Sequence, residues 1–494
     1  MTVTSRPAAA PLIRPEESRV IWLLLAAAFV AILNETTMGV AIPHVSEDFG
    51  IDSAAAQWLT TAFMLTMAVV IPTTGFLLRR FTTRQVFIAA MSLFSVGTLV
   101  AAVAPLFPVL LTARVIQASG TAIMMPLLMT TLMTVVPPHA RGRMMGRVSV
   151  VISFAPAIGP VMSGVISETA NWRWTFAVVL PIAIISLAVG ARWISNLGET
   201  TRAPIDVASV VLSAFGFGGV VYGLSQIGGA QAHGGDGAAE AGSSLPLVIS
   251  LVVGVVGLTL FVLRQLRLQR TDAALLDLRV FTDRNFTLAI LQVTVLSIAF
   301  FGSIIVLPLY MQNVLGMTAS ASGLAALPGA LLMGLAGPFI GRIYDARGTR
   351  ILLIPGAVLV ISMLWTLTTF NERTELWAIV ATQTVLSLGL AVSFTPLFTA
   401  ALGSVPKRFI SYGSAVVSTI QQVAGAAGIA VMVTVMTAVT ASQTASGVDP
   451  AVAGSAGTNA AFLIAAIISV PLLLGAFLIR KPADSGDGEP AITH

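Results

Sequence analysis

Long apolar runs separated by short polar loops dominate the sequence. Each run is long enough to form a helix across the hydrocarbon core of a membrane, which takes about 20 residues. The pattern therefore predicts an all-α integral membrane protein with 14 transmembrane helices. We place the runs at residues 20–43, 56–78, 85–104, 106–136, 143–167, 174–195, 206–227, 246–264, 286–310, 320–341, 351–370, 376–402, 412–438 and 459–479.

The amino-acid composition supports this fold class and excludes several kinds of functional site. Hydrophobic residues make up 56% of the 494 residues and charged residues only 10%, whereas a soluble protein carries about 25% charged residues. The absence of cysteine excludes disulfides and thiolate metal sites. No metal-ligand spacing, nucleophile–base arrangement or phosphate-binding loop occurs. We therefore expect no metal, no cofactor, no coupling to ATP within this chain and no enzymatic activity.

The basic residues are distributed asymmetrically among the loops. Alternate loops and the two tails hold 23 of the 26 Lys and Arg residues, and the other loops hold only Arg173 and Arg373. By the positive-inside rule, this pattern predicts a multi-pass protein of the cell membrane with both termini in the cytoplasm. The net charge of +5 then reflects topology and lipid headgroups rather than a nucleic-acid partner. The first apolar run is too long for a signal peptide and is expected to remain as a helix.

An internal repeat divides the chain. The segments G75-F-L-L-R-R-F-T-T-R84 and G341-R-I-Y-D-A-R-G-T-R350 match in Gly, apolar and basic positions at an offset of 266 residues. Repeated six-helix halves are a transporter architecture, with the substrate site between them near the membrane midplane. We predict a cytoplasmic tail at 1–19, a six-helix bundle at 20–195, two inserted helices at 206–264, a cytoplasmic linker with an interfacial helix at 265–285, a second six-helix bundle at 286–480 and a tail at 481–494.

Two opposite charges lie inside predicted transmembrane helices. Glu35 is nine residues before His44, and Arg114 is nine residues after Pro105. A helix rise of 1.5 Å per residue puts both about 13 Å below the outer face, where an unpaired charge is costly. We therefore expect Glu35 and Arg114 to pair. Burial disfavours an ionised carboxylate and a guanidinium favours it. Glu35, which would carry the proton, and Arg114, which would modulate it, are therefore the candidate proton-coupling residues, with a fixed brace between helices as the alternative.

Other polar and aromatic residues are candidates for lining a substrate cavity or for closing the protein. Each of them has a plain alternative role in helix packing or, for the basic residues, in membrane topology. The candidates for substrate binding, besides Glu35, are Asn34, Gln117, Gln292, Phe300, Phe301, Phe394 and Gln421. The candidates for gating are Gly75, Arg79, Arg80, Arg84, Gly159, Pro160, Gly164, Gly341, Asp345, Arg347 and Arg350.

Five motifs on the predicted helices resemble those of the major facilitator superfamily, in its fourteen-span drug:proton antiporter branch. The similarity covers nearly the whole chain. The motifs are N34-E-T-T-M-G-V-A-I-P43, Q57-W-L-T-T-A-F-M-L-T-M-A-V-V-I-P-T-T-G-F-L77, R114-V-I-Q-A-S-G-T-A122, A155-P-A-I-G-P-V-M-S-G164 and N171-W-R-W-T-F176 with Pro181. The chain departs from the family pattern where Asn34 and Arg79 replace Asp and where Ala118 replaces Gly.

The resemblance implies a proton-coupled secondary exporter that works by alternating access as a monomer. Its substrates would be hydrophobic or amphipathic compounds, including cationic ones, and its other partners the membrane lipids. A dedicated exporter of one lipid, antibiotic or metabolite is the main alternative. An importer of sugars or metabolites is disfavoured by the antiporter-like stretch from Ala155 to Pro160 and by the scarcity of polar groups within the helices. A membrane-embedded enzyme or a sensor would need clustered catalytic groups or an added soluble domain, and the sequence shows neither.

Overall fold

The computed structural model describes residues 14–196, 206–232 and 245–482. These residues form helices and connecting turns, and 14 helical segments are long and apolar enough to cross a membrane, which confirms the predicted fold class. The helices are α1 (Pro15–Phe49), α2 (Ser53–Arg80), α3 (Thr83–Ala102), α4 (Phe107–Val135), α5 (Arg141–Thr169), α6 (Arg173–Trp193), α7 (Val207–Ala232), α8 (Leu245–Leu268), α9 (Arg284–Asn313), α10 (Ala319–Arg347), α11 (Arg350–Leu367), α12 (Leu376–Ser404), α13 (Ile410–Ala445), α14 (Pro450–Ser469) and α15 (Pro471–Leu478).

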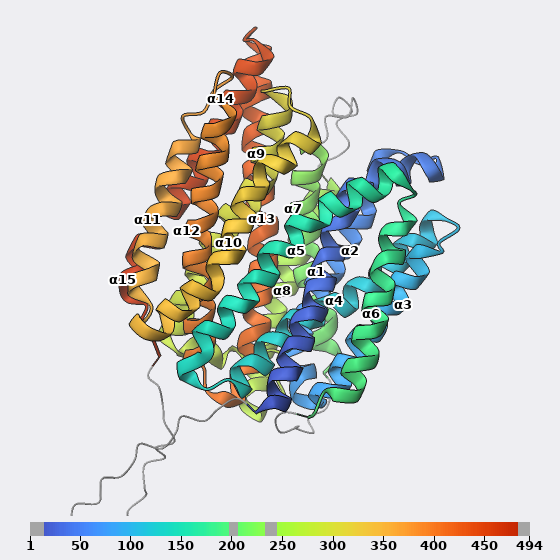
Figure 1. Ribbon diagram of the computed structural model, residues 1–494, viewed down its shortest axis with the longest axis vertical. Helices are drawn as coiled ribbons and strands as arrows, with labels where there is room; N and C mark the ends of the chain where they lie inside the picture. The colour runs from blue at the N-terminus through green and yellow to red at the C-terminus, as the bar shows by residue number, and fades with distance from the viewer. Residues whose placement is uncertain (1–13, 197–205, 233–244, 483–494) are drawn as a thin grey trace, which may run out of the picture.

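The helices form two six-span bundles with an inserted pair. Helices α1–α6 make the first bundle, α9–α15 make the second, and α14 with α15 together form its last span. Figure 1 shows the bundles side by side, with α5 and α10 adjacent at the centre and α7 between α2 and α13. We call the end of the molecule that carries the loops 81–82 and 348–349 the basic end, which topology predicts to be cytoplasmic.

Glycines bring the two bundles into contact near the basic end. A Cβ atom added to Gly341 of α10 would lie 2.0 Å from the carbonyl oxygen of Gly142 of α5. One turn further, a Cβ atom on Gly146 would lie 2.2 Å from the carbonyl oxygen of Gly337. Only residues without a side chain permit such close approach of two helix backbones. The predicted gating residue Gly341 therefore lies directly in the contact between the halves.

The linker between the bundles differs from the prediction. No interfacial helix spans 265–285: α8 continues to Leu268, and short 3-10 turns follow at Gln269–Thr271 and Leu278–Thr282. Leu275, Leu276 and Val280 are buried in the main hydrophobic core. The helix prediction was wrong because these apolar side chains pack against the transmembrane helices rather than against lipid.

Candidate functional site

A cavity of about 600 Å³ lies between the two bundles. Its wall is built from α1, α2, α4 and α5 of the first bundle and from α9, α10, α12 and α13 of the second. The wall is mainly apolar, with a few hydroxyl and amide groups. Glu35 is the one ionisable residue among the described residues that line it. A mostly apolar pocket with a few polar groups is typical of a binding site for a small organic molecule.

Glu35 faces the cavity because of its position on α1. The residues of α1 that line the wall include Ala28, Ile32, Glu35 and Gly39, which are three or four positions apart and therefore share one face of the helix. No hydrogen bond or ion pair joins the Glu35 carboxylate to another described residue. The carboxylate is thus free to interact with whatever occupies the cavity.

Arg114 lies beside the cavity, in a fully buried polar cluster. Its NH1 atom donates hydrogen bonds to Oδ1 of Asn34 at 3.1 Å and to Oε1 of Gln117 at 2.6 Å. Its guanidinium carbon lies 4.1 Å from the centre of the Phe63 ring. Gln117 in turn donates to Oγ1 of Thr98 at 2.8 Å. This network fixes Arg114 between α1, α2, α3 and α4.

The expected ion pair between Glu35 and Arg114 is not formed, since no oxygen of Glu35 lies within 4.0 Å of an Arg114 nitrogen. The physical reason is helix geometry, because successive side chains are turned by about 100°. Asn34 therefore faces α4 while Glu35 faces the cavity. Within the described residues, Nε and NH2 of Arg114 and Nδ2 of Asn34 have no hydrogen-bond partner, so this cluster has unused donors.

The other predicted binding residues divide into two groups. Phe300, Phe301 and Gln421 line the cavity, and Phe394 lies behind Phe300, with 6.0 Å between the ring centres. Asn34 and Gln117 belong to the buried Arg114 cluster instead of the wall. The placement of Gln292 at the cavity was wrong.

Gln292 faces the last span of the second bundle. Its Nε2 atom donates to the carbonyl oxygen of Pro471 at 3.2 Å, and a Cβ atom on Gly475 would lie 1.9 Å from it. The break between α14 and α15 occurs at Val470, next to that carbonyl. Gln292 is therefore a packing residue between α9 and α15.

Asp345 of the second bundle contacts the first bundle at the basic end. Its Oδ1 accepts from the backbone N–H of Gly142 at 2.8 Å, and its Oδ2 accepts from that of Arg143 at 2.8 Å. Both donors lie in the first turn of α5, where unpaired N–H groups and the helix dipole favour a carboxylate. We call this contact the Asp345 cap. It joins α10 of the second bundle to α5 of the first.

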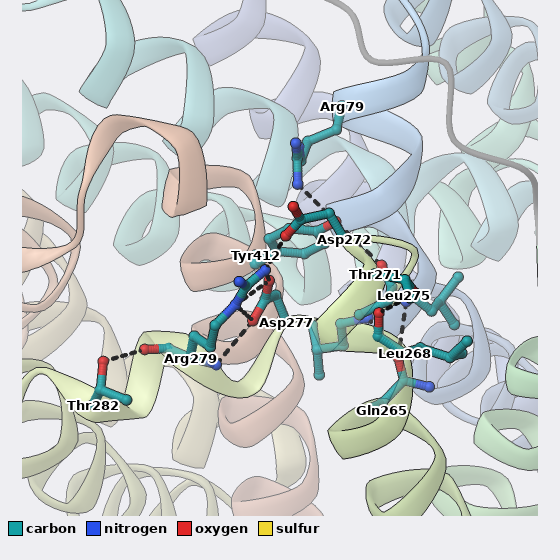
Figure 2. Close-up of polar contacts among 12 residues, drawn as sticks. Arg79, Gln265, Leu268, Thr271, Asp272, Leu275, Asp277, Arg279, Thr282 and Tyr412 are labelled. Carbon is teal, nitrogen blue, oxygen red and sulfur yellow. Dashed lines mark hydrogen bonds and ion pairs between the residues drawn. The ribbon is translucent and has the colours of Figure 1, made fainter.

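The first copy of the loop motif makes a different contact, since Arg79 stands where the family pattern has Asp. NH1 of Arg79 donates to the hydroxyl of Tyr412 at 3.1 Å, and that hydroxyl donates to the carbonyl oxygen of Ala274 at 3.1 Å. A Cβ atom on Gly75 would lie 2.9 Å from the Tyr412 ring. Figure 2 shows Arg79, Tyr412 and the linker together. We call this contact the Tyr412 clasp, which joins α2, α13 and the linker.

Carboxylates of the linker surround the Tyr412 clasp. Asp277 is buried and pairs with Arg279 at 2.6 Å, and Arg279 also pairs with Asp272. The Arg279 guanidinium holds the pKa of Asp272 below its usual value, with a smaller contribution from Arg79. The linker thus places negative charge near Arg79 (Figure 2).

Three further gating candidates, all on α5, contact α1 or the cavity within their own bundle. A Cβ atom on Gly159 would lie 2.1 Å from Oγ1 of Thr36, Pro160 lines the cavity, and Gly164 lies near Val40. These residues pack α5 against α1 beside Glu35. Arg80 stacks over Phe81. Arg84, Arg347 and Arg350 make no hydrogen bond or ion pair to another described residue.

Sequence reasoning missed several contacts between the bundles. Thr130 hydrogen-bonds to Ser414 at 2.6 Å, and Ser149 hydrogen-bonds to Thr395 at 2.6 Å. These two hydrogen bonds join α4 to α13 and α5 to α12. The signal for them in the sequence is weak, because Ser and Thr are common in helices of membrane proteins.

Comparisons with known proteins all point to one protein family. The model of the Major Facilitator Superfamily matches residues 24–429. The uncharacterized MFS-type transporter YcnB of Bacillus subtilis is 43% identical over 96% of this chain and 97% of its own length. The lincomycin resistance protein LmrB of the same organism is 39% identical over 93% of this chain and 95% of its own length. The crystal structure of the human organic anion transporter MFSD10 shares the fold, with a TM-score of 0.62 at 15% identity over 94% of this chain and all of that one.

Proposed function

Because the chain belongs to the Major Facilitator Superfamily and is a multi-pass membrane transporter, we propose that it exports hydrophobic or amphipathic compounds, cationic ones included, in exchange for protons. The observation that carries the proposal is the single carboxylate, Glu35, on the wall of an apolar cavity between the two bundles. No cationic residue is among the described residues of that wall, so the cavity favours a cation or a neutral molecule over an anion.

Competition at Glu35 provides the coupling in this proposal. A protonated Glu35 is neutral and has no charge to attract a cation, whereas an ionised Glu35 attracts one. In an apolar wall that difference is large, because charges interact more strongly at low dielectric. A proton and a cationic substrate therefore exclude each other at one site, which is what exchange requires.

Alternating access would use the contacts at the basic end. In this proposal the Asp345 cap and the Tyr412 clasp hold that end closed. Both consist of noncovalent contacts, which can open and form again. We assign the basic end to the cytoplasm of the cell and the protein to the plasma membrane, as a monomer. The resistance named for LmrB supports export as the direction of transport.

A dedicated exporter of one lipid, antibiotic or metabolite is the second candidate. The same relative, named for resistance to lincomycin, favours it. In that case only one compound class would be transported, and unrelated cationic dyes would neither bind nor compete.

Reconstituted vesicles test the proposal. The parent chain should release a cationic amphipathic dye faster when a pH gradient is imposed, and Glu35→Gln should lose that acceleration. Glu35→Asp is the matched control, because it retains a carboxylate on a side chain that is shorter by one methylene. This variant should retain a reduced acceleration. Gradient-driven release by Glu35→Gln at the parent's rate would refute the coupling role of Glu35.

A further inference from the structure

The two bundles meet along two lateral interfaces, which we call seams. The seams differ in whether a further helix covers them. One seam runs between α5 and α10, and the other between α2 and α13. By the internal repeat these seams are equivalent, since α2 corresponds to α10 and α5 to α13. The cavity wall reaches both seams: Thr60 and Met67 of α2 line it, and so do Ala326 and Met333, their counterparts 266 residues later on α10.

Helix α7 covers the seam between α2 and α13. Ala68 of α2, Val221 of α7 and Ala426 of α13 form one buried cluster, with exposed fractions of 1%, 1% and 6%. Trp58 of α2 stacks on Tyr222 of α7, with 5.7 Å between the ring centres. Because Met67 on the same stretch of α2 faces the cavity, α7 lies directly outside the cavity wall here. Figure 1 shows α7 in this position.

Helix α8 holds α7 in place. Glycines bring the two helices together: a Cβ atom on Gly219 would lie 2.8 Å from Gly254, and one on Gly257 would lie 2.8 Å from Gly216. At the basic end, Arg264 makes two bonds to the carboxylate of Asp206, at 2.7 and 2.8 Å. The inserted helices therefore form one stiff hairpin against the seam.

No described helix covers the other seam in the half of the membrane away from the basic end. Helices α5 and α10 contact each other at the level of Gly334, where an added Cβ atom would lie 2.1 Å from the Phe154 ring. Beyond that level, α5 and α10 both line the cavity. Their outer faces are bare, with exposed fractions of 40% for Ile158 and 61% for Leu324.

We infer that the inserted hairpin α7–α8 closes the lateral route between α2 and α13, so that amphipathic molecules pass between the cavity and the bilayer only between α5 and α10. The inference rests on the proposed function for the kind of molecule that passes. The inserted pair would then select the path of the substrate. A flexible apolar chain can cross the bare seam, whereas at the covered seam it meets a second layer of packed helices.

Site-specific labelling tests the route without using transport. The chain has no cysteine, so a single introduced cysteine reports only on its own position. Thr60→Cys and Ala326→Cys are matched by the repeat, and both positions line the cavity. In proteoliposomes, one probe is a small hydrophilic maleimide in the water, and the other is a phospholipid that carries a maleimide at the end of an acyl chain.

We expect the water-soluble probe to label both cysteines at similar rates, because both face one cavity. The lipid probe should label Ala326→Cys at least about ten-fold faster than Thr60→Cys, which corresponds to a barrier difference of about 1.4 kcal/mol. Equal labelling of the two positions by the lipid probe would overturn the inference. Failure of dye export with unequal labelling would overturn only the proposed function.

A second set of variants assigns the barrier to α7. Phe217→Ala with Val221→Ala removes two side chains of α7 that pack at the covered seam. This change should raise lipid-probe labelling of Thr60→Cys toward that of Ala326→Cys. Phe215→Ala is the matched control, because that side chain is 59% exposed on the same helix, and it should have no effect. If the double variant does not fold, the comparison in the parent background still decides.

Discussion

The Asp345 cap gives the most direct prediction for the closed basic end. Asp345→Asn keeps the shape of the side chain but presents an amide NH2 group to one of the two N–H donors of α5. Loss of a helix cap costs about 1 kcal/mol, and loss of the charge at a helix N-terminus costs about 0.3–1 kcal/mol. We therefore expect the closed form to lose about 1–2 kcal/mol, which lowers its population relative to the open form about five- to thirty-fold.

Access to the cavity from the basic end measures this change. Met124 lines the cavity and is 1% exposed, and the chain has no other thiol to interfere when Met124→Cys is introduced. A membrane-impermeant maleimide on the side of the basic end should label this cysteine faster in the Asp345→Asn background by the same factor of about five- to thirty-fold.

Asp48→Asn is the matched control, because Asp48 pairs with Arg173 at 2.6 Å at the opposite end and within the first bundle. It removes one carboxylate without touching the contact between bundles. An unchanged labelling rate in Asp345→Asn, or an equal rise in Asp48→Asn, would refute the reasoning that the Asp345 cap holds the basic end closed.

Three more predictions follow from the contacts. Tyr412→Phe removes two hydrogen bonds worth about 1–3 kcal/mol together and should also speed labelling at the basic end. Tyr222→Phe should not, because among the described residues the Tyr222 hydroxyl accepts a hydrogen bond only from Gln226 of its own helix. Gly146→Leu should lower the unfolding temperature measured in detergent, because α5 and α10 cannot approach as closely, while cavity-facing Gly39→Ala should not, since nothing lies within 4 Å of the added Cβ atom. The pKa of Asp206 is lowered to about 2 by Arg264, so its ion pair contributes stability at pH 7 that is lost as the pH falls toward 2. Asp206→Asn should therefore destabilise the chain slightly, by less than about 1 kcal/mol, at pH 7, and the difference from the parent in thermal unfolding should vanish near pH 2.

The fold was predictable because the bilayer imposes a length on every spanning helix. Runs of about 20 apolar residues have few alternatives, so the 14 helices could be found from the sequence. The linker was not predictable in the same way. The apolar pattern at Leu275, Leu276 and Val280 fits burial in lipid and burial in protein equally well, and only the neighbouring helices decide between them.

The site was partly predictable for a related reason. A carboxylate within a transmembrane helix indicates a cavity, and Glu35 does line one. Whether it contacts Arg114 was not predictable from depth alone. Equal depth in the membrane puts two residues at the same level, but the rotation of each helix about its axis decides whether their side chains face each other. Gln292 shows a different limit: an amide in a membrane helix needs a partner, and here a backbone carbonyl beside the break at Val470 supplies it.

Asn34 and Glu35 are neighbours on α1 and have different contacts: Asn34 binds Arg114, and Glu35 faces the cavity. Arg114 is satisfied in part by the neutral amide of Asn34, so its charge is not cancelled by contact with Glu35. An acid at position 34 would instead meet the unused donors of Arg114 and remain ionised beside it. Placed one residue later, the acid faces the cavity and is available to a proton or a cationic ligand. The double change Asn34→Asp with Glu35→Gln keeps one carboxylate on α1 yet moves it to Arg114, and we expect it to abolish gradient-driven dye release while the single change Asn34→Asp retains it. Equal release by the double variant and the parent would show that depth in the membrane, and not the cavity-facing side of α1, decides where the carboxylate must lie.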